Sequence, residues 1–169
     1  QGSLWRADIT EKEPIVEQIP FEHSIYLARL SPDAQKVLYL TRVGTKPRAL
    51  ALRVYNLTNR SENILVEKVT PSLFDFENYQ FNPIWASDSE TILYNAIAGR
   101  QHTEILTTQQ NKPETAKNVI LSENMYYYPI SWSPDGQFIL AARRSLSPDS
   151  KGSFYRVLVD IEGANIQEI

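Results

Sequence analysis

The stretch Tyr128–Ala141, YPISWSPDGQFILA, decides the fold of this chain. It runs from an apolar segment ending at Trp132, through a turn at Ser133–Gly136, into a second apolar segment that begins at Phe138. Proline fixes φ near about −65°, which suits the first corner of a reverse turn, and aspartate accepts hydrogen bonds from the amides that follow it. Gly136 can adopt positive φ without a steric cost. Because the flanking residues are β-branched or aromatic, the stretch predicts a β-hairpin.

Two further stretches repeat this pattern. Leu27–Tyr39 reads LARLSPDAQKVLY, and Asn82–Tyr94 reads NPIWASDSETILY. The turn aspartates Asp33, Asp88 and Asp135 are separated by 55 and 47 residues. Periods of roughly 40–50 residues are typical of propeller blades, each a four-stranded sheet. The three aspartates are therefore interpreted as turn residues and not as catalytic groups.

The turn chemistry differs among the copies. Ala34 and Ser89 stand where the third copy has Gly136, and Ser87 stands where the other two have proline. Residues other than glycine adopt positive φ reluctantly. We therefore expect these two turns to be less ideal than the third, or of another type.

A second short motif also recurs along the chain. It is an apolar–Asp/Asn–apolar triplet, seen at residues 7–9, 55–57 and 159–161. Together with the Ser-Pro-Asp-Gly turn, this pattern resembles the TolB-like group of β-propeller repeats, which are related to the WD repeat. The resemblance covers nearly the whole chain. It implies an all-β fold, but it implies little about function, because propellers serve many roles.

The predicted fold class is therefore all-β, a β-propeller fragment of about three and a half four-stranded antiparallel blades. Residues 1–3 resemble a cloning remnant, and residues 4–169 are expected to form a single partial propeller domain. This domain divides into a half blade at 4–19 and blades at about 21–69, 73–122 and 126–169. Closed propellers have roughly 4–8 blades, so this arc cannot close alone. We expect it to belong to a longer protein, with self-association of the open ends as the alternative.

Composition narrows the range of partners. The formal net charge of −3 gives no attraction toward nucleic acid. No apolar run approaches the roughly 18 residues that a membrane helix needs, so membrane insertion is not expected. The chain has no cysteine and therefore no disulfide framework or thiolate metal site.

Motifs for catalysis are missing from the sequence. It contains neither a G-x-S-x-G elbow, nor H-E-x-x-H, nor a glycine-rich phosphate loop. His23 and His102 stand alone, without the spacing of metal ligands. We therefore expect no catalytic residue, no metal and no cofactor in this domain.

Tyrosine and arginine are the residue types enriched where protein partners dock. Several lie in the segments expected to connect strands on one face of the propeller, and they are the candidates for partner binding: Phe76, Tyr79, Arg100, Tyr126, Tyr127, Tyr128, Arg143 and Arg144. The alternative is that the aromatic residues pack between blades. If the three consecutive tyrosines form a strand, at least one should face away from the core.

The sequence therefore leaves three functional hypotheses. The first is a non-catalytic module that binds a protein or small-molecule ligand, as the sensor or scaffold part of a larger bacterial envelope protein. Such a parent would be TolB-like or a membrane-anchored transcriptional regulator with an exported propeller. This hypothesis implies a periplasmic or extracytoplasmic location, while a cytoplasmic one stays open.

The second hypothesis is the propeller of a serine peptidase resembling the prolyl oligopeptidase group, where the propeller gates a separate hydrolase domain. The third is a propeller that binds or cleaves sugars. The full reading frame distinguishes the first hypothesis from the second. A G-x-S-x-G domain downstream favours the peptidase, whereas a DNA-binding segment upstream with an apolar segment of about 20 residues favours the sensor.

Overall fold

The computed structural model describes residues 3–10, 12–21, 25–44, 49–69, 82–97, 102–109, 112–123, 125–145, 154–160 and 165–169. Within these ranges the regular secondary structure consists of β-strands alone, and the predicted all-β class is confirmed. No helix of the described residues has the length and apolar character needed to cross a membrane.

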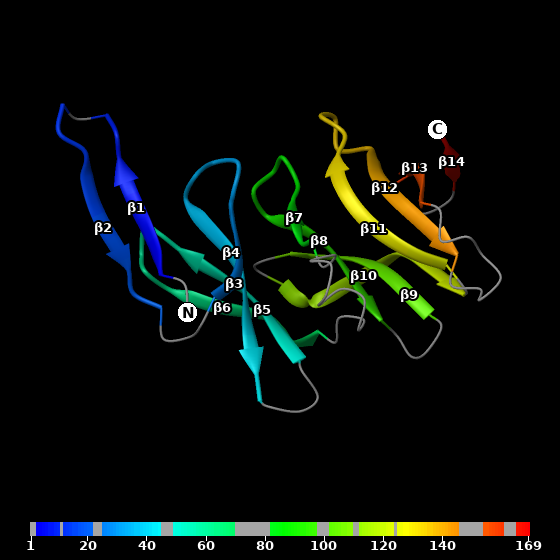
Figure 1. Ribbon diagram of the computed structural model, residues 1–169, viewed down its shortest axis with the longest axis horizontal. Coiled ribbons are helices and arrows are strands. Elements are labelled where there is room, and N and C mark those ends of the chain that lie inside the picture. The colour runs from blue at the N-terminus through cyan, green and yellow to red at the C-terminus, as the bar shows by residue number, and fades with distance from the viewer. Residues whose placement is uncertain are drawn as a thin grey trace.

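The strands form one two-stranded hairpin and three four-stranded antiparallel sheets, which we call the first, second and third blade (Figure 1). The hairpin consists of β1 (Leu4–Asp8) and β2 (Ile15–Ile19). The first blade contains β3 (Ile25–Leu30), β4 (Lys36–Val43), β5 (Ala49–Asn56) and β6 (Glu62–Val69). The second contains β7 (Ile84–Trp85), β8 (Thr91–Ile97), β9 (His102–Gln109) and β10 (Lys112–Glu123). The third contains β11 (Met125–Trp132), β12 (Phe138–Ser145), β13 (Phe154–Asp160) and β14 (Ile166–Glu168).

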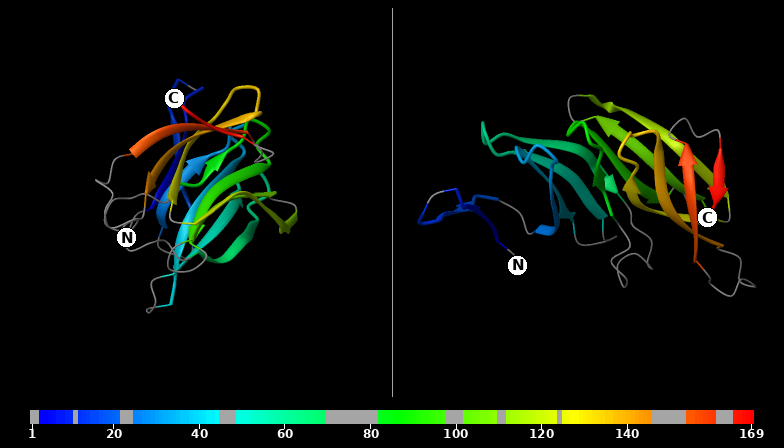
Figure 2. Two further views of the ribbon diagram at one scale, coloured as in Figure 1. Left: turned by 90° about the vertical axis from the view of Figure 1, so that its right-hand side faces the viewer. Right: turned by 90° about the horizontal axis from the view of Figure 1, so that it is seen from above.

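In each blade the strands lie in the order in which they occur in the chain, so consecutive strands are neighbours. The hairpin and the three blades stand side by side in one row, with β1–β2 at one end and β11–β14 at the other (Figures 1 and 2). This is the predicted arrangement of half a blade followed by three blades.

The core lies between neighbouring sheets and follows from the period of two along a strand. Along β4, Val37 and Tyr39 pack toward the hairpin, in a cluster with Ile19. Leu38 and Leu40 point the other way and pack against the second blade, beside Ile92 and Tyr94. These side chains are buried, and each buried residue of this size stabilises the fold by roughly 1.5–3 kcal/mol.

The second blade is buried on both faces in the same way. Ile92 packs toward the first blade, whereas Leu93 packs toward the third, in a cluster with Ile139, Ala141 and Val157. The first and second blades therefore each pack against a hydrophobic core on both faces.

The three aspartate turns share one backbone geometry. In each, the amide of the fourth turn residue donates to the carbonyl of the first, from Ala34 to Ser31 (2.9 Å), from Ser89 to Ala86 (3.2 Å) and from Gly136 to Ser133 (2.9 Å). The donor residue is left-handed in every copy, with φ of +58° at Ala34, +58° at Ser89 and +71° at Gly136. Of the two expected alternatives, the turns at Ala34 and Ser89 are thus less ideal than the third and not of another type, because a residue with a Cβ adopts the left-handed conformation. The strand pairing on either side fixes where the chain must reverse, and the left-handed conformation costs roughly 1–2 kcal/mol at a residue with a Cβ.

Each turn aspartate accepts hydrogen bonds from its own turn. Asp33 Oδ1 accepts from the Gln35 amide (3.0 Å) and the Ser31 hydroxyl (2.5 Å). Asp135 Oδ1 accepts in the same way from the Gln137 amide (3.1 Å) and from Ser133 (2.5 Å). Asp88 Oδ1 accepts from the amides of Glu90 (2.8 Å) and Thr91 (2.7 Å).

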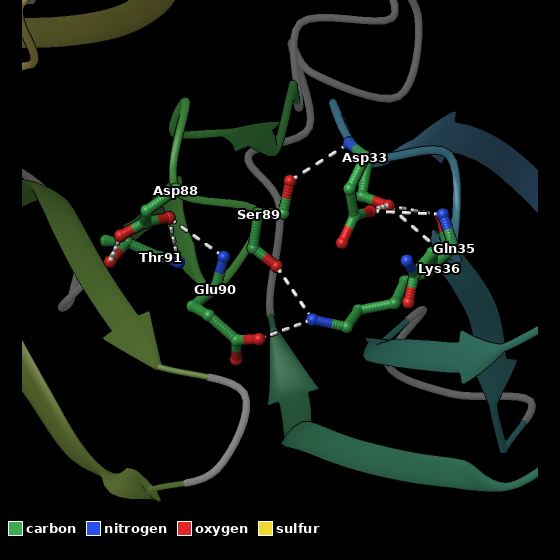
Figure 3. Close-up of polar contacts among 8 residues, drawn as sticks. Asp33, Gln35, Lys36, Asp88, Ser89, Glu90 and Thr91 are labelled. Carbon is green, nitrogen blue, oxygen red and sulfur yellow. Dashed lines mark hydrogen bonds and ion pairs between the residues drawn. The ribbon is translucent and has the colours of Figure 1, made fainter.

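Polar contacts also join the first turn to the second (Figure 3). The ammonium of Lys36, whose side chain is nearly fully buried, donates to the Ser89 carbonyl (3.0 Å) and to Glu90 Oε1 (2.5 Å). The Asp33 amide donates to the Ser89 hydroxyl (3.0 Å). In the third blade the position of Lys36 is taken by Phe138, which is 40% exposed. An ionic contact therefore joins the first blade to the second. The third blade carries no charged side chain at the position equivalent to Lys36.

We expect Ala34→Gly to raise the free energy of unfolding by about 0.5 kcal/mol. Glycine removes the left-handed strain of about 1–2 kcal/mol and increases the entropy of the unfolded chain by a smaller amount. The matched control is Gly136→Ala, whose new Cβ would meet no atom within 4 Å, so its effect reports the left-handed strain less the entropy lost by the unfolded chain, without a steric clash. Urea unfolding should show a loss of about 0.5 kcal/mol for Gly136→Ala. A destabilising Ala34→Gly would contradict the turn geometry described above.

The turns also predict how stability depends on pH. Hydrogen bonds from the Ser133 hydroxyl and the Gln137 amide hold the pKa of Asp135 below its usual range, and those from Ser31 and Gln35 do the same for Asp33. Because the folded pKa lies below the unfolded value of about 3.9, this stabilisation is complete above that value and is lost as pH falls through the folded pKa.

The urea midpoint should therefore fall as pH is lowered below about 4, and it should fall less in the double variant Asp33→Asn/Asp135→Asn. The control is Glu13→Gln, which removes an exposed carboxylate without a hydrogen-bond partner among the described residues. It should keep the wild-type slope. Equal slopes for the double variant and the wild type would show that the turn carboxylates do not contribute.

Candidate binding groove on the inner strands

The structure changes the placement of the candidates for partner binding. Phe76, Tyr79 and Arg100 lie outside the described residues. The other five lie within strands and not in connecting segments, at Tyr126, Tyr127 and Tyr128 in β11 and at Arg143 and Arg144 in β12. Their placement in loops is therefore wrong. The reason is that the β11–β12 ladder extends to the pair Met125–Ser145, well past the apolar segments that mark the hairpin in the sequence.

The consecutive tyrosines have packing partners. Tyr126 and Tyr127 are both buried, and Tyr128 is half-buried. Tyr127 belongs to the core between the second and third blades, and the Tyr126 hydroxyl accepts a hydrogen bond from Asn95 Nδ2 (2.9 Å). Arg143 pairs with Glu168 of β14 (2.8 Å). These contacts give the residues structural roles, and their part in partner binding stays a prediction.

A different set of residues forms a groove where the first strands of the three blades meet. The strands β3, β7 and β11 each form one edge of their sheet. Arg29 donates from its Nη2 to Asn82 Oδ1 (2.8 Å), and Asn82 Nδ2 donates to the Pro129 carbonyl (3.3 Å). The Trp85 indole N–H donates to the Arg29 carbonyl (3.2 Å). Hydrogen bonds thus connect all three first strands, which places them along the inner edge of the row of blades.

We call this site the inner-strand groove. It has a volume of about 360 Å³ and is lined by Arg29, Leu30, Pro32, Asn82, Ile84, Trp85 and Ile130. Its walls include apolar side chains that remain open to solvent, because Leu30 is 56% exposed and Ile130 is 39% exposed. The groove therefore combines apolar surface with one positively charged residue.

Asn82 positions the groove. It is buried, and both ends of its amide are used, since the oxygen accepts from Arg29 in the first blade and the nitrogen donates to Pro129 in the third. A single side chain therefore fixes the spacing of three blades at this edge. Sequence analysis did not single it out. The available signal was a polar residue at the position where the other copies have Leu27 and Pro129.

Arg29 supplies the charge. It is exposed, and the guanidinium N–H groups that do not face Asn82 have no acceptor among the described residues. The lining side chains are a guanidinium, an amide and apolar groups. Such groups can bind a ligand, but they do not exchange protons near neutral pH, so the groove is suited to recognition. The described residues also contain no group of three or more histidine, cysteine or acidic side chains arranged to hold a metal ion.

Comparison with solved structures shows that the chain is a partial β-propeller. TolB from Acinetobacter baumannii matches it with a TM-score of 0.65 and 18% identity, over 98% of this chain and 37% of that one. The β-propeller domain of the Trilobed protease from Pyrococcus furiosus matches with a TM-score of 0.64 and 12% identity, over 99% of this chain and 48% of that one. A puromycin-hydrolyzing peptidase from Mycobacterium tuberculosis matches with a TM-score of 0.63 and 14% identity, over 98% and 27%.

The likeness to TolB agrees with the resemblance seen in the turn motifs, and at these identities it establishes the fold. The chain spans less than half the length of each of these three proteins. No protein-family model matches the sequence, and no curated protein matches it significantly.

Asn82→Ala should lower the free energy of unfolding by about 1–2 kcal/mol, because it removes two hydrogen bonds and leaves the Pro129 carbonyl without its donor. The control is Asn63→Ala, which removes an exposed amide on β6 and should change stability by less than about 0.5 kcal/mol. Urea unfolding of both variants tests this. Equal losses would mean that Asn82 does not hold the blades together.

Proposed function

We propose that this chain is a non-catalytic binding module that holds a protein or small-molecule ligand in the inner-strand groove. The observation that carries the proposal is the combination of exposed apolar side chains with a guanidinium whose remaining donors have no acceptor in the part of the chain that the structure describes. Ligand sites typically combine apolar walls with a few well-placed polar groups. The buried amide of Asn82 holds these groups in a fixed geometry before any ligand arrives.

We further propose that the module is the sensor or scaffold part of a larger bacterial envelope protein with an extracytoplasmic location. The structural likeness to TolB supports this proposal, as does the resemblance of the turn motifs to TolB-like repeats. The chain covers 37% of that TolB, which is consistent with a propeller that continues beyond these residues.

Site-specific photo-crosslinking tests the binding role. A benzophenone amino acid is placed at Leu30 or Ile130 in the full-length protein, expressed in its own host, and adducts are identified after irradiation. We expect one defined adduct from both groove positions, because both side chains face the bound ligand. The control position is Ile64 on β6, which is 44% exposed and lies outside the groove. The same adducts at Ile64, or none at the groove positions, would count against a ligand in the groove.

A second candidate is the propeller of a prolyl oligopeptidase-like serine peptidase, which gates a separate hydrolase domain. The observation that favours it is the structural match to the propeller domain of the Trilobed protease and to the puromycin-hydrolyzing peptidase. The full reading frame decides between the two. A downstream domain with a G-x-S-x-G elbow would support the peptidase, provided that replacing its serine by alanine abolishes peptide hydrolysis by the full-length protein.

A further inference from the structure

We infer that the inner-strand groove recognises an extended peptide segment in which an Asp or Glu side chain is flanked by aliphatic residues. This inference rests on the proposed binding function and names the chemical class of the ligand. Arg29 is the residue that would contact the carboxylate, and Asn82 is a positioning residue that holds the guanidinium in place.

The charge argument comes from comparing Arg29 with other arginines of the described residues. Four of these pair with glutamates, in the ion pairs Arg6–Glu17, Arg53–Glu62, Arg60–Glu17 and Arg143–Glu168. Arg29 instead faces the neutral amide of Asn82, and none of the described residues that line the groove is acidic. Arg29 differs from these four because its printed partner is a neutral amide and because it lies among apolar lining residues. A carboxylate from the ligand would supply the missing countercharge.

The geometry of the guanidinium favours a carboxylate over other acceptors. Arginine presents its donors in a planar fork that matches the two oxygens of a carboxylate. Asn82 occupies one Nη2 donor and leaves the others available to a ligand. Because the oxygen of Asn82 is held in place by the contact of its nitrogen with the Pro129 carbonyl, it fixes the direction in which the fork points.

The apolar surface argues for a peptide and not for a free small acid. The exposed side chains Leu30 and Ile130 belong to the first and third blades, so apolar contacts lie on either side of the second blade's Trp85. Leu30 is 56% exposed and Ile130 is 39% exposed, so the groove is shallow, whereas a pocket for a drug-sized molecule usually buries most of the ligand surface. An extended peptide places alternate side chains on one face, so an acidic residue and its aliphatic neighbours can reach separate parts of such a groove.

A peptide array probed with the full-length protein tests the inference. The peptides carry Glu, Asp, Gln or Lys at the centre, flanked by varied combinations of Leu, Ile, Val and Ala, with both termini blocked. A hydrogen bond to a charged group is roughly twice as strong as one between neutral groups, so we expect Glu- or Asp-centred peptides to bind at least about tenfold more tightly than their Gln counterparts. Binding should weaken as the salt concentration rises, because the contact is partly exposed.

Variants of Arg29 give the decisive comparison. Arg29→Gln should abolish the preference for acidic peptides, and Arg29→Glu should transfer it to Lys-centred peptides. The matched control is Arg42→Gln, which removes an exposed arginine outside the groove and should leave the preference unchanged. Urea midpoints of all three variants show whether each is folded, and the transfer of preference in Arg29→Glu cannot arise from unfolding.

Two outcomes would overturn the inference. One is an array without acidic preference, or with the same preference in Arg29→Gln. The other is complete displacement of the best peptide by an equal concentration of N-acetylglutamate amide, which would show that a small acid suffices. Crosslinks at Leu30 and Ile130 that persist in Arg29→Gln would then still support a ligand in the groove. The failure of this inference can therefore be told apart from the failure of the proposed function.

Discussion

Apolar packing between neighbouring sheets is the interaction on which the rest of this structure depends. Successive residues of β4 serve different cores, Leu38 with the second blade and Tyr39 with the hairpin. A slip of one residue in strand pairing would exchange these faces and expose both sets of side chains. The aspartate turns must therefore reverse the chain at one fixed position. This requirement explains why Ala34 and Ser89 accept a left-handed conformation that glycine would adopt more easily.

The blades repeat in sequence, but their junctions are chemically distinct. Lys36 reaches from the first blade to Ser89 and Glu90 of the second. Between the second and third blades, the polar contacts include the hydrogen bonds from Asn95 to the Tyr126 hydroxyl and from Asn82 to the Pro129 carbonyl. If Glu90 were replaced by a neutral residue, the buried ammonium of Lys36 would lose its counterion. Packing of the second blade against the first would then be destabilised. The two junctions therefore differ in chemistry although the blades share one architecture.

The architecture could be predicted from the sequence because it depends on local patterns that recur. The aspartate turn and the apolar alternation around it each act within a few residues, and this turn recurs at Asp33, Asp88 and Asp135. The positions at which the strands end were harder to predict from the sequence. The ladder of β11 and β12 continues through Tyr126 and Arg144, where polar and aromatic residues give no clear alternation. The five described candidates for partner binding therefore lie in β11 and β12, where the sequence analysis expected connecting segments.

The groove could not be predicted, because its defining contacts join residues about one blade apart in the sequence. Arg29 and Asn82 are separated by 53 residues, and Asn82 and Pro129 by 47. Each pair is close only because the first strands of successive blades converge at the inner edge. A repeat detected in the sequence says which positions are equivalent, and equivalent positions on adjacent blades are neighbours in space. The most informative residue is therefore the one that breaks the repeat, and Asn82 replaces apolar residues at just such a position. The contacts that form the groove thus come from a residue that departs from the repeat, whereas residues shared by the copies, such as Leu38 and Ile139, pack in the cores.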